Sequence, residues 1–325
     1  MSAGPPDNRH QILALTGGGF RGVFTASFLR QCEKEWGPVW LDRFQLFAGT
    51  SVGALLAAGL AAGRTAEQLV GAMKTHGPKI FARRRLDGPR RLFGSASYSN
   101  EPLREAAKAV LGAQADILLS DFPGKLVVTA VNFSRGKTEL FTSAGLAGAN
   151  ASKVKLVEAI LASAAAPTFF PFVKIDRYEY ADGGLVANAP DVVALIEAMR
   201  RQRADIERSY MLSVGTASWS DGVEVGEEPG KPGIIQSLWG RRLVQTTMAA
   251  QEDLALQQIR ILMKDRHVRV DREPDRVRAA AIRSLDNASP EAFAALGQVA
   301  EECWGDWIDR QNQAGDHRLR DFFAR

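Results

Sequence analysis

Residues 44–63 read FQLFAGTSVGALLAAGLAAG, a run of 20 residues without a charged side chain. A run of this length approaches what a helix needs to cross a bilayer. Gly49 and Gly53 enclose a short turn within the run, and this turn would interrupt a membrane helix. We therefore expect a buried strand over 44–48, a tight turn and a buried helix over 52–62, in a chain that is soluble.

Short apolar runs alternate with helical patterns along the rest of the chain. Strands are expected at 11–15, 44–48, 125–131, 172–175, 178–181 and 210–214. Helices are expected at 23–35, 52–62, 66–75, 101–111, 153–163, 191–202, 234–263 and 290–311. This order predicts an α/β fold with a central, mainly parallel sheet flanked by helices.

Composition narrows the class of protein. Among 325 residues, 41 are basic and 37 acidic, and the net charge of +4 is too small to indicate binding to a nucleic-acid polymer. Cys32 and Cys303 lie far apart in the sequence and form neither a disulfide framework nor a metal-ligand pair. Residues 1–10 lack the apolar stretch of a signal peptide. We expect a cytoplasmic protein without a metal or cofactor.

The pentapeptide at 49–53, Gly-Thr-Ser-Val-Gly, matches the pattern G-x-S-x-G between an expected strand and an expected helix. This context is typical of a nucleophile elbow, a sharp turn that lifts a serine hydroxyl clear of the backbone. The following helix places its positive dipole end beside Ser51, which favours developing negative charge. The alternative is a small-residue turn in which the serine has no catalytic role.

A second motif, Gly-Gly-Gly-Phe-Arg-Gly at 17–22, follows the first strand. Consecutive glycines allow backbone N–H groups to converge on an anion, either a phosphate or a tetrahedral oxyanion. Gly17, Gly19 and Gly22 also fit G-x-G-x-x-G, and Asp42 lies 20 residues beyond Gly22. A dinucleotide-binding protein therefore stays open as an interpretation, as does a turn without any ligand.

A third motif, Asp-Gly-Gly at 182–184, follows the strand expected at 178–181. A carboxylate in this place could accept a proton from a neighbouring hydroxyl, although Asp-Gly-Gly alone mostly marks a turn. The histidines lack the placement of a Ser…Asp…His hydrolase and are expected on the surface; they are His10, His76, His267 and His317. A Ser51 nucleophile with Asp182 as its base is the economical interpretation.

Taken together, the three motifs resemble those of patatin-like phospholipases. That family has a glycine-rich oxyanion loop ending in Arg-Gly, then a G-x-S-x-G elbow, then Asp-Gly-Gly, in the order found here. The small-residue segment 162–167, followed by Phe170 and Pro171, resembles the family segment before its catalytic aspartate. Thr16 departs from the family, since many members carry aspartate before the glycines. The resemblance covers about 11–190.

The resemblance implies a patatin-like hydrolase fold and a serine acyl hydrolase that cleaves ester bonds of membrane phospholipids. Ser51 would attack the ester and Asp182 would take its proton. The oxyanion hole would consist of Gly17, Gly18 and Gly19, with the last two as amide donors and Gly17 shaping the loop. The supporting motif residues are Arg21, Gly22, Gly49, Gly53, Gly183 and Gly184. A soluble esterase or lysophospholipase is the alternative within this class.

The domain expected from the resemblance covers 11–325, with the motifs in 11–190 and a helical part in 191–325, after a flexible tail at 1–10. Segment 79–91 carries six basic residues and one acidic residue. Its net charge of +5 suits an anionic lipid surface or another anionic ligand, although a solvated loop is the alternative. The arginines of this segment are Arg83, Arg84, Arg85, Arg90 and Arg91.

Compact patatin-like chains of this length also resemble the phospholipase effectors of bacterial anti-phage defence. That resemblance implies a cyclic oligonucleotide activator, and an enzyme at the inner face of the membrane when active. The stretch after Pro190 is where an interface of a homo-oligomer is expected.

Overall fold

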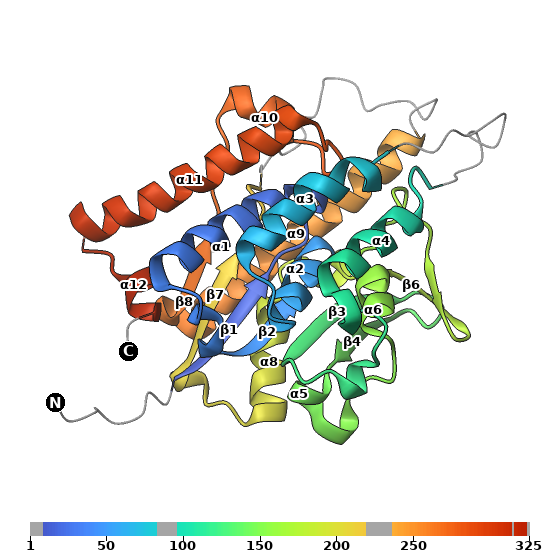
Figure 1. The fold of residues 1–325 in the computed structure, drawn as a ribbon, viewed down its shortest axis with the longest axis horizontal. Helices are drawn as coiled ribbons and strands as arrows, with labels where there is room; N and C mark the ends of the chain where they lie inside the picture. Colours follow the sequence, from blue (N-terminus) through green and yellow to red (C-terminus); the bar gives the residue numbers. More distant parts are fainter. Residues whose placement is uncertain (1–8, 83–95, 219–235, 314, 324–325) are drawn as a thin grey trace.

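The computed structural model describes residues 9–82, 96–218, 236–313 and 315–323. Within this part of the chain, eight strands form one sheet in the order β5-β6-β3-β2-β1-β7-β8, and β4 pairs with β3 (Figure 1). The strands are β1 (His10–Leu15), β2 (Phe44–Gly49), β3 (Leu126–Asn132), β4 (Lys137–Thr142), β5 (Val173–Ile175), β6 (Tyr178–Asp182), β7 (Ser209–Val214) and β8 (His267–Val270).

Five neighbouring strands, β3, β2, β1, β7 and β8, run parallel, whereas β4 and β6 are antiparallel to β3. The mainly parallel sheet predicted from the sequence is therefore confirmed. Strands β4 and β8 were not expected from the sequence. Both are rich in charged or polar residues, and their strand structure depends on pairing with β3 and β7 rather than on a local apolar pattern.

Helices cover both faces of the sheet, and alternation along β1 shows why. Leu13 and Leu15 pack into one core cluster, while Ile12 and Ala14 pack into the other. The first face carries α1 (Gly22–Trp36), α2 (Val52–Ala61), α3 (Ala66–Ile80), α4 (Asn100–Leu111), α6 (Leu156–Ser163) and α11 (Pro290–Gln313). The second carries α5 (Ala144–Ala147), α8 (Asp191–Gln202) and α9 (Gln236–Met263). Shorter helices are α7 (Gly184–Ala187), α10 (Arg276–Ile282) and α12 (Arg318–Phe323).

Most expected helices appear within a few residues of their predicted bounds, with two larger differences. Helix α3 runs through Pro78 to Ile80, past the end expected at 75, because Ile80 is buried in the core. Helix α6 begins at Leu156 rather than at 153, because Lys155 pairs with Leu118 in an isolated β-bridge. Tertiary contacts decide both boundaries.

The segment 44–63 forms β2, a turn and α2, as its glycines predicted. In the described part of the chain, no helix combines the length and the apolar character that a membrane span requires. The tail expected at 1–10 lies mostly outside the described residues, and His10 already belongs to β1.

Strands β2 and β6 share one edge of β3, because β4 pairs with the opposite edge. They approach from opposite directions, so that their carboxyl ends meet. Gly49 at the end of β2 pairs with Val128, and Asp182 at the end of β6 pairs with Ala130. The turn after β2 and the last residue of β6 are thereby brought together.

The close approach of α2 to β1 generates a stability prediction. A Cβ atom at Gly53 would collide with the carbonyl oxygen of Leu15, so Gly53→Ala should lower the free energy of unfolding by about 1–3 kcal/mol. The matched control is Gly71→Ala in α3, where a Cβ would meet no atom within 4 Å. That change should stabilise the protein by about 0.5–1 kcal/mol. Urea unfolding measures both, and equal effects at the two glycines would contradict the predicted clash.

Candidate active site

Ser51 lies in a strained turn between β2 and α2. Its backbone has φ of 55° and ψ of −124°, a conformation that non-glycine residues rarely adopt. Ser51 is buried, with 8% of its surface exposed. This geometry is the one expected of a nucleophile elbow, in which strain places the hydroxyl at the start of a helix.

Ser163, the last residue of α6, forms hydrogen bonds with the backbone at Ser51 and next to Asp182. Its hydroxyl oxygen accepts a hydrogen bond from the Ser51 N–H at 2.8 Å. Its carbonyl oxygen accepts one from the Gly183 N–H at 3.2 Å, and the neighbouring Ala165 carbonyl accepts one from the Asp182 N–H at 3.0 Å. The small-residue segment 162–167 therefore connects the turn at Ser51 to Asp182 by hydrogen bonds. The sequence indicated that this segment resembles the family, but it did not reveal these hydrogen bonds.

Asp182 is a buried carboxyl at the end of β6, and it is 1% exposed. Burial raises its pKa from 3.8 to about 7, although hydrogen bonds from the Gly184 N–H and the Ser51 hydroxyl partly oppose the shift. The Gly184 bond to Oδ1 measures 2.6 Å. Among the described residues, Oδ2 accepts no hydrogen bond, so this oxygen is open to a proton.

The glycine-rich loop lies directly beside the elbow. A Cβ at Gly17 would be only 3.3 Å from Cβ of Ser51. The Gly17 N–H donates to the Asn188 carbonyl at 3.0 Å, so this amide is not free to bind a substrate oxygen. The amides of Gly18 and Gly19 have no hydrogen-bond acceptor among the described residues. Of the three glycines expected in the oxyanion hole, Gly17 thus shapes the loop and two remain as candidate donors.

The other motif residues support this arrangement from close range. Neighbouring backbone or side-chain atoms leave no room for a Cβ atom at Gly22, Gly49, Gly53, Gly183 and Gly184. Burial lowers the pKa of the Arg21 guanidinium, and the carboxylates of Glu252 and Asp271 oppose this shift. Arg21 therefore faces two acidic groups of the protein itself.

A buried polar network stands behind the glycine loop. Arg269 of β8 donates from Nη1 to the Thr16 hydroxyl at 2.8 Å, and from Nη2 to Glu252 and Asp271, each at 2.8 Å. Glu252 of α9 also accepts a hydrogen bond from Nδ2 of Asn188 at 2.7 Å. Thr16, the departure from the family pattern, is therefore a hydrogen-bond acceptor for Arg269. The motifs could not reveal Arg269 and Glu252, because both come from the C-terminal part of the chain.

His267 contradicts the expectation that the histidines are surface residues. It is buried, and its Nε2 atom lies 2.8 Å from Oδ1 of Asp191. Burial would raise the pKa of Asp191, but the hydrogen bond with His267 and the nearby Arg269 hold this pKa below its usual range. All four histidines lie within the described residues, and none forms a hydrogen bond with Ser51.

Two expectations concern ligands. The described part of the chain contains no group of three or more His, Cys, Asp or Glu side chains that could hold a metal ion. The arginines proposed to contact lipid or an anionic ligand, Arg83, Arg84, Arg85, Arg90 and Arg91, lie outside the described residues.

A family model and two relatives of nearly full length describe phospholipases. Residues 13–195 match the family model described as patatin-like phospholipase. The chain is 32% identical to a cGAMP-activated phospholipase of Escherichia coli, over 97% of this chain and 93% of that protein. It is also 32% identical to a cGAMP-activated phospholipase of Vibrio cholerae, over 98% and 97% of the two chains. Among solved structures, VipD from Legionella pneumophila is similar with a TM-score of 0.43 and 13% identity, covering 91% of this chain and 67% of VipD.

The buried carboxyl of Asp182 generates a second prediction. Its folded-state pKa is raised, so its stabilising contribution is complete below the unfolded value of 3.8 and is lost as the pH rises to about 7. Asp182→Asn has no carboxyl at this position, so its stability does not fall over this pH range for this reason. The unfolding free energy of the variant minus that of the natural protein should therefore be about 2 kcal/mol larger at pH 8 than at pH 5.5. Urea unfolding at both pH values measures it, and a pH-independent difference would contradict the raised pKa.

Proposed function

The chain belongs to the patatin-like phospholipase family, and we propose that it hydrolyses membrane phospholipids through Ser51 and Asp182. The observation that carries the proposal is the meeting of these two residues. A strained, buried serine at a helix start lies beside a carboxyl whose pKa is raised to about 7. A carboxyl with this pKa is poised to exchange protons near neutral pH.

Chemistry begins when Oγ of Ser51 attacks the carbonyl carbon of the ester and Asp182 accepts the hydroxyl proton. The tetrahedral intermediate collapses into an acyl-enzyme, and the leaving alkoxide takes the proton from Asp182. A water molecule then attacks the acyl group and transfers its proton to Asp182. Collapse of the second intermediate releases the fatty acid and returns the proton to Ser51, so that both residues regain their starting state.

The negative oxygen of each tetrahedral intermediate needs stabilisation. The amides of Gly18 and Gly19 supply two free donors in a loop beside Ser51, and the start of α2 adds its dipole. Removal of one such donor typically raises the barrier by about 3–4 kcal/mol. The dinucleotide-binding interpretation receives no support from this loop, since Gly17 lies against Ser51 and Asp42 is exposed.

We further propose that a cyclic dinucleotide activates the enzyme. The E. coli and V. cholerae relatives, which match nearly the whole chain, are named for activation by cGAMP. The lipid substrate supports the same idea, because an unregulated phospholipase inside a cell would attack the membrane of that cell. The enzyme would then serve in anti-phage defence and act at the inner face of the membrane.

The third prediction tests the catalytic pair. Ser51→Ala and Asp182→Asn should each lower kcat for ester hydrolysis by about 10³-fold or more, and the double variant should be little worse than either. Matched controls are Ser134→Ala and Asp121→Asn, both at exposed positions outside the site. Hydrolysis of a soluble ester, with and without cGAMP, measures the effect. Wild-type turnover in Ser51→Ala, or a loss caused by replacing the exposed His317, would overturn the assignment.

The fourth prediction tests activation. Adding cGAMP to the pure protein should raise fatty-acid release from phospholipid vesicles by on the order of 10- to 100-fold, since allosteric coupling commonly spans about 5- to 150-fold. A linear dinucleotide serves as the control and should leave the rate unchanged. Mass spectrometry of the released lipids measures both. Full activity of the ligand-free protein would show that the enzyme is not gated.

A further inference from the structure

A second polar cleft lies outside the candidate active site. It has a volume of about 600 Å³ and is lined by residues of α9, β8, α11 and α12. This volume falls in the range of about 300–1,000 Å³ that is typical of small-molecule sites. Six basic and four acidic side chains line the cleft, so its charged lining is net positive.

Three of the cations are available to a ligand. Arg260 on α9, Lys264 in the turn that follows α9 and Arg310 on α11 line the cleft and are exposed. None of the three forms a salt bridge within the described part of the chain. By contrast, Arg269 and Arg272 in the same wall are each paired with two carboxylates. Cations without a carboxylate partner that line one cleft favour a compact ligand with more than one negative charge.

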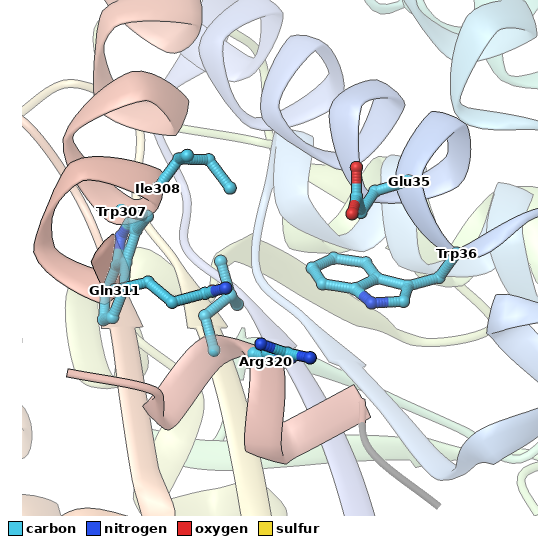
Figure 2. A pocket seen from close by; sticks show the side chains of 7 residues that line it. Glu35, Trp36, Trp307, Ile308, Gln311 and Arg320 are labelled. Atoms are coloured by element: carbon cyan, nitrogen blue, oxygen red, sulfur yellow. The ribbon is translucent and has the colours of Figure 1, made fainter. Parts of the chain in front are cut away.

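Two arginines of the cleft cover a buried tryptophan. Trp307 of α11 is 6% exposed, and the guanidinium groups of Arg310 and Arg318 lie 5.6 and 5.7 Å from the centre of its ring. Trp307 also borders a second pocket of about 310 Å³, where Figure 2 shows it across from Trp36 with Arg320 between them. Guanidinium groups stack on nucleobases and bind phosphates. Because Arg310 is exposed and its guanidinium lies over the Trp307 ring, it offers a planar face to a base, and the cleft suits a nucleotide better than a simple anion.

The cleft is also connected to the oxyanion loop by hydrogen bonds. Arg269 in its wall donates to Thr16, the residue directly before the glycines. Glu252, in the same wall, accepts from the Asn188 side chain, and the Asn188 carbonyl holds the Gly17 N–H. An anion in the cleft would compete with Glu252 and Asp271 for Arg269. A ligand bound in the cleft can thus change the position of the glycine loop through the side chain of Arg269 alone.

We propose that this cleft is the binding site of the activating cyclic dinucleotide, with its phosphates on Arg260 and Lys264 and a base stacked on the guanidinium group of Arg310. Binding changes the contacts of Arg269 and Glu252, and thereby the position of the Gly18 and Gly19 amides beside Ser51. The site assignment rests on the proposed activation by a cyclic dinucleotide and adds where that ligand binds.

The direct test is titration of the protein with cGAMP by calorimetry. The double variant Arg260→Glu/Lys264→Glu should bind cGAMP about 100-fold or more weakly than the natural chain, because charged hydrogen bonds are replaced by repulsion. The matched control is Lys137→Glu/Lys174→Glu, which reverses two exposed lysines on β4 and β5 and should keep wild-type affinity. Equal affinity of the natural chain and the first double variant would overturn the site assignment alone.

A footprint on the natural chain removes any dependence on how a variant folds. Saturating cGAMP should slow acetylation of Lys264 at least about fivefold and leave Lys174 unaffected. If the natural chain binds no cGAMP, the proposed activation itself fails, together with the site. If cGAMP binds but leaves Lys264 unprotected, or if anionic lipid vesicles alone protect it, the cleft is not the nucleotide site, although activation still stands.

Discussion

The shared edge of β3 is the constraint on which the rest of the site depends. Two strands reach this edge from opposite directions, with Gly49 opposite Val128 and Asp182 opposite Ala130. Two residues along a strand span about 6–7 Å, so the chain that leaves β2 meets the end of β6 within the reach of side chains. Because side chains alternate between the faces, a slip of one residue in β6 would turn Asp182 to the opposite face of the sheet.

This arrangement works against stability in two places, and both have a chemical use. Ser51 adopts a positive φ, which typically costs about 1–3 kcal/mol for a residue other than glycine. Asp182 carries a carboxyl that burial keeps partly protonated near neutral pH. Ser163 and its neighbours offset these costs by bonding the backbone on both sides. The same strain exposes the hydroxyl, and the same burial makes the carboxyl a base suited to neutral pH.

Local sequence was sufficient to predict the elements that carry the motifs. Glycine spacing predicted the turn at Ser51, and a carboxylate at a strand end predicted the place of Asp182. Long-range pairing decided what local patterns could not. Strand β8 lies in a charged stretch and exists through its pairing with β7, which buries His267 and brings Arg269 behind the loop. The use of the Gly17 amide by Asn188 is equally invisible to spacing, because 171 residues separate the two.

The central claim is that Asp182 is the base that activates Ser51. The most direct measurement is the rate at which a fluorophosphonate labels Ser51 as a function of pH, in the natural chain and in Asp182→Asn. The account predicts labelling at Ser51 with a rate that rises to a plateau through about pH 7. The variant should be labelled about 100-fold or more slowly and without that step. Labelling of the variant at the natural rate, or with the same step near pH 7, would contradict the account.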